Sequence, residues 1–140
     1  MFKGIRRLSE MTKIIRFSAD AANATIPMID MLFEQESNEV KQPLLSIYVA
    51  FLAIRQKWKH HTDSEINYET VHHIYRAEHY LTPMDRERLI VYSFTILVNC
   101  LEPLHALADE ATVNYNSGNE SISADCIATM LSVIYNEMKK

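Results

Sequence analysis

Residues 44–54 read Leu44-Leu45-Ser46-Ile47-Tyr48-Val49-Ala50-Phe51-Leu52-Ala53-Ile54, and this nearly unbroken apolar run decides the expected fold. It lies inside a longer segment, residues 38–59, whose pattern predicts a helix. A helix that is hydrophobic on every side is buried on every side. We therefore expect this helix to run through the middle of the domain or into a subunit interface.

The composition around this run indicates an all-α protein. Glycine occurs twice and proline four times, whereas an all-β domain needs turn residues every 8–12 positions. The apolar share of 48% and the charged share of 23% are those of an ordinary globular chain, which argues against disorder. A chain of 140 residues fits one domain. We expect residues 1–140 to form a single helical domain.

Apolar periodicity and capping signals predict a bundle of five or six helices. Two of them, at 38–59 and from 83 past 100, are apolar on all sides and are expected at the centre. Pro103 is expected to kink the second of these near residues 99–102, and the polar run 114–120 is expected to be a loop. The predicted helices, with their expected caps, are 3–22, 25–35 (Thr25), 38–59 (Ser37 or Asn38), 62–80 (Thr62 with Glu65), 83 onward (Thr82) and one ending near Met138 (Ser121 or Ser123).

Two all-round apolar helices are a surplus for a domain of this size. This surplus predicts a protein partner or a homo-oligomer, most simply a homodimer. Cys100 and Cys126 both lie in apolar runs and are expected to be reduced core thiols. The N-terminal residues lack the apolar region of a secretory signal, and the apolar run from Leu89 to Ala108 is interrupted by polar residues, so it predicts a core helix. A cytoplasmic location follows as the expectation.

Two pairs of acidic residue and histidine could carry metal chemistry. Glu69 with His72, and Glu102 with His105, each place a carboxylate and an imidazole on one helical face. Carboxylate-bridged di-iron bundles use such pairs together with a glutamate from each of two further helices. The segment from Val40 to Trp58 has no acidic residue to complete that set. The competing interpretation is a solvated face for the first pair and a structural role at the kink for the second, and no cofactor is predicted.

A second possible catalytic pair is Arg55 with His60, which has the spacing of the Arg and His of HEPN-type ribonucleases. There the arginine would stabilise charge on a phosphorus centre and the histidine would move a proton. Gln56 replaces the Asn, Asp or His usual after that arginine. The simpler interpretation is a solvated basic end of the helix 38–59, where the helix dipole favours positive charge.

The first predicted helix, 3–22, is basic on one side. A basic amphipathic helix can contact anionic lipid or nucleic acid. The net charge of −4 and the smooth continuation of its apolar stripe favour a packed helix instead. If the chain does bind through basic residues, the candidates are Arg6, Arg7, Lys13, Arg16, Arg55 and Lys59.

These patterns favour a non-enzymatic protein-interaction module that regulates or inhibits another protein by binding it. The alternative is a helical enzyme, either metal-dependent through Glu102 and His105 or ribonuclease-like through Arg55 and His60.

Overall fold

A computed structural model describes residues 24–60 and 85–140 of the chain. These residues form a helix at 24–32 followed by α2 (Asn38–His60), α4 (Arg86–Asn116) and α5 (Glu120–Met138), with no strand among them. The predicted all-α class is thereby confirmed for the described part. The helices predicted at 3–22 and 62–80 lie outside the described residues.

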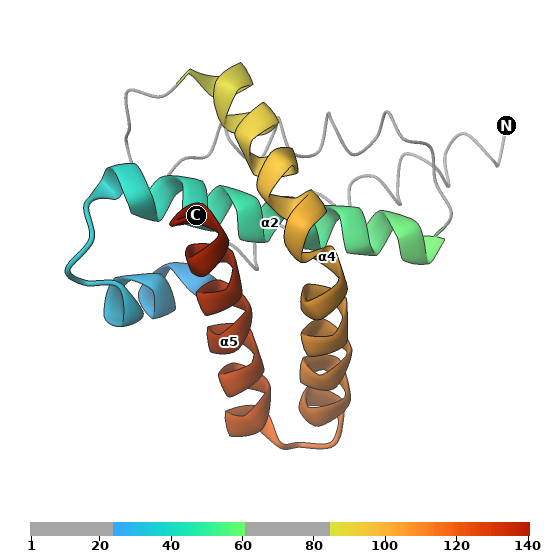
Figure 1. Ribbon diagram of the computed structural model, residues 1–140. Coiled ribbons are helices and arrows are strands. Elements are labelled where there is room, and N and C mark those ends of the chain that lie inside the picture. Colours follow the sequence, from blue (N-terminus) through green and yellow to red (C-terminus); the bar gives the residue numbers. More distant parts are fainter. Residues whose placement is uncertain (1–23, 61–84) are drawn as a thin grey trace, which may run out of the picture.

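Helices α4 and α5 pack against each other as an antiparallel hairpin (Figure 1). Ser117–Asn119 connect them, and Gly118 has a φ of 82°, a left-handed conformation that glycine adopts without strain. The Asn119 N–H donates to the carbonyl of Asn114 at 2.8 Å, which closes the turn. The predicted loop 114–120 is therefore too long, because helical hydrogen bonding carries α4 through the polar residues up to Asn116.

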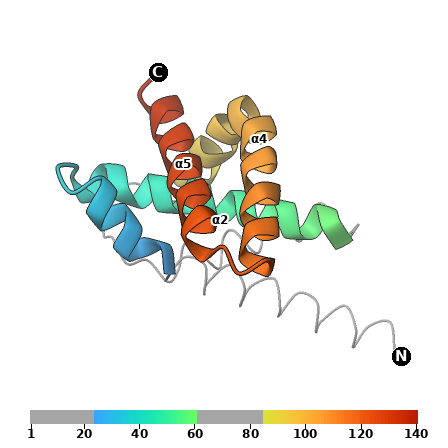
Figure 2. The same ribbon diagram turned by 90° about the horizontal axis from the view of Figure 1, so that it is seen from below.

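Helix α2 runs across the α4–α5 hairpin (Figures 1 and 2). Every residue from Gln42 to Leu52 is buried, including Leu44, Ile47 and Phe51, which are fully enclosed. Burying each such side chain stabilises the fold by about 1.5–3 kcal/mol. The prediction that this apolar run would be buried on all sides is confirmed over residues 44–52.

Helix α4 is long and changes direction in its middle, as Figure 1 shows. Pro103 lies inside it, where the proline ring removes one backbone hydrogen bond and clashes with the preceding turn. At its N-terminus Asp85 is the cap, because its side chain accepts the Glu87 N–H at 2.9 Å. The expected cap, Thr82, lies outside the described residues, and α4 begins later than predicted.

Two other predicted caps have different roles. Thr25 lies inside the helix 24–32 and is buried, and its side chain hydrogen-bonds the hydroxyl of Tyr48 on α2. Ser123 is also buried, and its hydroxyl donates to the carbonyl of Ala111 on α4 at 2.9 Å. Both hydroxyls join neighbouring helices instead of ending their own. The residue before α5 is Asn119, and its side chain makes no capping bond.

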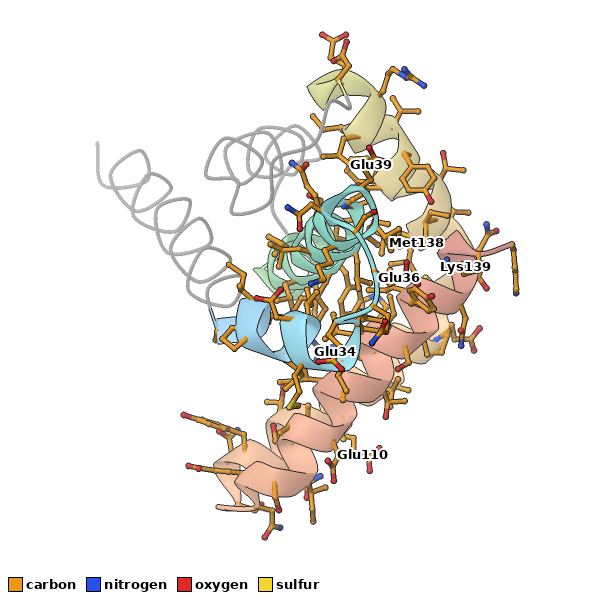
Figure 3. The ribbon with its side chains drawn as sticks, turned by 90° about the vertical axis from the view of Figure 1, so that its left-hand side faces the viewer. Glu34, Glu36, Glu39, Glu110, Met138 and Lys139 are labelled. Carbon is orange, nitrogen blue, oxygen red and sulfur yellow. The ribbon has the colours of Figure 1, made fainter. Side chains whose placement is uncertain are left out.

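The segment between the helix 24–32 and α2 is attached to the end of α5. The Tyr135 hydroxyl donates to the carboxylate of Glu36, and Lys139 Nζ lies 3.6 Å from that carboxylate. Glu36 and Lys139 lie next to each other in Figure 3. The ring of Phe33 also packs on Tyr135 at 4.8 Å between centroids. These contacts bring the N-terminal part of the described chain against its C-terminus.

Candidate functional site

The crossing of α2 and α4 joins a cation, an imidazole and a carboxylate. Arg55 on α2 donates from Nη1 to the backbone carbonyl of His105 at 3.4 Å, and its Nη2 pairs with the carboxylate of Asp109. The His105 ring stands edge-on to Phe51 at 5.1 Å between centroids. Arg55 and Phe51 are four positions apart on α2, so one face of that helix supplies both contacts.

Burial and charge at this crossing favour a neutral histidine. Burial and the nearby Arg55 guanidinium lower the pKa of His105, and Asp109 opposes that shift. The hydrogen bond and the positive charge of Arg55 lower the pKa of Asp109. At neutral pH the cluster therefore contains an arginine cation, an aspartate anion and an uncharged imidazole. Such a set can hold two helices together without any substrate.

The crossing shows how Arg55, one of the two residues of the ribonuclease-like alternative, is engaged. Two donor groups of Arg55 already bind Asp109 and the carbonyl of His105. For His60 only the backbone, within α2, is described. A guanidinium engaged in this way is poorly placed to stabilise developing charge on a phosphate.

The metal-site candidates are only partly within the described residues. Glu102 is exposed on α4 and His105 is half-buried at the crossing. Among the side chains that the structure describes, no three from His, Cys, Asp or Glu gather closely enough to hold a metal ion. Glu69 and His72 lie outside the described residues, so their convergence with Glu102 and His105 stays a prediction.

The predicted basic binding residues are likewise mostly beyond the described part. Arg6, Arg7, Lys13 and Arg16 lie outside it, and for Lys59 only the backbone, within α2, is described. Arg55 is the one candidate whose side chain is described, and its ion pair with Asp109 occupies it. The pairing of Arg55 with Asp109 was not predicted, because it depends on how two distant helices cross.

A second candidate site is the solvent-facing side of α4 before its bend. Val91 and Val98 are 65% and 75% exposed there. The hydroxyl of Thr95, between them, donates to the carbonyl of Val91 at 2.9 Å, so this side chain adds no unpaired donor to the surface. Arg88 and Glu102 are exposed at the two ends of the stretch. We call the five residues Arg88, Val91, Thr95, Val98 and Glu102 the outer α4 face.

The opposite side of the same stretch is buried, with Leu89, Ser93, Leu97 and Cys100 almost fully enclosed. This burial orients the helix, so that the outer α4 face points to solvent. Figures 1 and 3 show this N-terminal part of α4 extending beyond the C-terminal end of α5. The sequence indicated apolar character on all sides of this helix but did not indicate which side would be uncovered.

Helix α4 is also long and apolar enough, from Glu87 to Asn116, to cross a membrane by length and composition. Of its most apolar 18-residue window 39% is buried, so the helix is neither fully enclosed nor fully bare. Core helices of soluble proteins meet the same length and composition criterion.

Comparisons of the whole chain with protein-family models, with curated proteins and with solved structures find no match.

Proposed function

We propose that this protein is a non-enzymatic interaction module that binds another protein through the outer α4 face and thereby regulates or inhibits it. The supporting observation is the exposure of Val91 and Val98 on a helix whose other side is anchored in the core. Apolar side chains grouped on one exposed helical face are typical of a surface that receives a partner.

The rigidity of the face strengthens this proposal. Leu89 and Leu97 are each 1% exposed, so they fix the rotation of α4 about its axis. A binding surface on an anchored helix loses little conformational entropy when a partner arrives. The apolar run of α2, by contrast, is buried from Gln42 to Leu52, so it presents no exposed surface for binding. The apolar surplus relevant to binding therefore resides on α4.

The proposal includes several finer features. Residues 1–140 form one domain of five or six helices with α2 and α4 at its centre, and the protein acts in the cytoplasm and self-associates, most simply as a homodimer. Contact of the basic segment 3–22 with nucleic acid or an anionic membrane is not part of it.

A pair of variants tests the binding face. The double substitution V91D/V98D places two charges on the outer α4 face, and V113D places one on an equally exposed valine of α4 in the half beyond the bend. We expect a protein captured by the full-length chain from its native host to be lost with V91D/V98D and retained with V113D. Equal capture by all three chains would contradict the proposal, provided that circular dichroism shows each one folded.

A further inference from the structure

The outer α4 face has a charge arrangement that complements itself. Arg88 lies at one end and Glu102 at the other, and Thr95 lies midway between them. Both charged side chains are exposed, and neither forms an ion pair with any described residue. Arg55, Lys41 and Lys139, by contrast, are all engaged with carboxylates.

We propose, building on the proposed function, that the occupant of the outer α4 face is a second copy of this chain, packed antiparallel across Thr95. A twofold axis at Thr95 reverses the helix direction, so each Arg88 comes opposite the Glu102 of the other copy. The two reciprocal ion pairs then lie at the ends of the contact, about 21 Å apart at 1.5 Å per residue.

The middle of the contact suits the close approach of two helices. Val91, Thr95 and Val98 are small β-branched residues with few rotamers to lose on burial. The Thr95 hydroxyl keeps its bond to the Val91 carbonyl, so burying it leaves no unsatisfied donor. A parallel pair would instead place Arg88 against Arg88 and Glu102 against Glu102, which the charges oppose.

The length of the straight segment of α4 limits the size of this contact. The straight segment ends at Glu102, because Pro103 follows and α4 bends. A contact along one such segment is small by the standard of stable dimers, so the association is weak and depends on salt. The same face then serves a different protein partner only when the two copies separate.

Charge reversal in the full-length chain tests this arrangement by sedimentation equilibrium over a concentration series at low salt. R88E and E102R each turn two attractive pairs into two repulsive ones and should weaken the dimer by about tenfold. The combined R88E/E102R chain restores opposite charges across the axis and should return to within about threefold of the wild-type affinity. E110R, which alters an exposed glutamate of α4 beyond the bend, is the matched control and should dimerise like the wild type.

Three results would overturn the antiparallel dimer: a wild-type chain that stays monomeric at all concentrations, single reversals without effect, or a double variant that is not rescued. Failure here is separable from failure of the proposed function. If V91D/V98D still abolishes capture of another protein while the chain is monomeric, the outer α4 face binds a different partner. If V91D/V98D changes neither capture nor self-association, both proposals fail.

Discussion

The carboxylate of Asp109 on α4 pairs with the guanidinium of Arg55 on α2, on the C-terminal side of the bend that Pro103 introduces. The same guanidinium donates to the carbonyl of His105. Arg55 thus contacts α4 at two points one helical turn apart. These two contacts of Arg55, which we call the Arg55 clamp, hold the second half of α4 in position while the first half extends beyond α5.

Removing the carboxylate of this clamp should have a small, measurable effect on stability. Asp109 is largely exposed, so solvent screens the ion pair, and Asp109→Ala should lower the free energy of unfolding by about 0.5–1 kcal/mol. Glu110→Ala is the control, because Glu110 is exposed beside it and forms no ion pair with any described residue. Urea denaturation measures both. A larger effect for Glu110→Ala would show that the pair contributes nothing specific.

His105 should make stability fall in mild acid. Its pKa is lowered in the folded state by burial and by Arg55, whereas an unfolded histidine titrates near pH 6.5. Below about pH 6.5 the unfolded chain therefore binds a proton that the folded chain does not, and the free energy of unfolding decreases until the folded pKa is passed. His105→Asn should remove this part of the pH dependence.

Denaturation between pH 8 and pH 5 measures the effect, and NMR of the His105 ring carbon gives the pKa itself. In Asp109→Asn the pKa of His105 should fall further, because the carboxylate that favours the protonated imidazole ring is gone. A His105 pKa above that of a free histidine would contradict the described crossing.

The hydrogen bond from Tyr135 to Glu36 should set the pH at which the Glu36 carboxylate titrates. The hydrogen bond from Tyr135 is the main cause that lowers the pKa of Glu36, and Lys139 adds to it. In Tyr135→Phe the pKa of Glu36 should rise toward its ordinary value. The stability linked to Glu36 is present above its pKa in the unfolded chain and is lost as the pH falls through its pKa in the folded chain. In Tyr135→Phe the free energy of unfolding should therefore depend less on pH in that acid range.

Carboxyl-carbon NMR follows Glu36 directly in this experiment. Tyr115→Phe is the control, because Tyr115 is 65% exposed near the far end of the α4–α5 hairpin. An unchanged Glu36 titration in Tyr135→Phe would show that the two side chains do not meet in solution.

Both cysteines should resist thiol reagents until the protein unfolds. Cys100 is 1% exposed and burial raises its pKa to about 11, and burial also raises the pKa of Cys126. The thiolate is the reacting form, so at pH 8 only a small fraction of Cys100 can react. Ellman's reagent should label neither thiol in the native protein and both in denaturant. Rapid stoichiometric labelling of the native chain would show an open core around α4 and α5.

The sequence predicted best those features that a short stretch of chain determines. The run from Leu44 to Leu52 has no polar side long enough to face water, so its burial followed from composition. The bend in α4 was predictable because the ring of Pro103 is fixed. The end of α4 was not predictable from the sequence, because Asn114 and Asn116 can continue a helix as well as form a loop. Gly118 marks the one turn between α4 and α5 correctly.

The features that sequence reasoning missed depend on how helices cross. Nothing near Arg55 in the sequence indicates Asp109 as its partner, because the contact forms only when α2 lies across α4. Likewise Val91 and Leu89 are equally apolar, and only the tertiary packing places one in solvent and the other in the core. The sequence pattern therefore predicted apolar character on all sides of α4 and did not distinguish its exposed side from its buried side.

The proposed partner at the outer α4 face is a second copy of this protein. Methyl-labelled valine NMR tests this claim most directly, with spectra of the full-length chain recorded over increasing concentration. We predict that the Val91 and Val98 methyl signals shift together as the copies associate, while the signal of Val113, 64% exposed in the half of α4 beyond the bend, stays unchanged. Association that shifts Val113 and leaves Val91 and Val98 unmoved would contradict the claim.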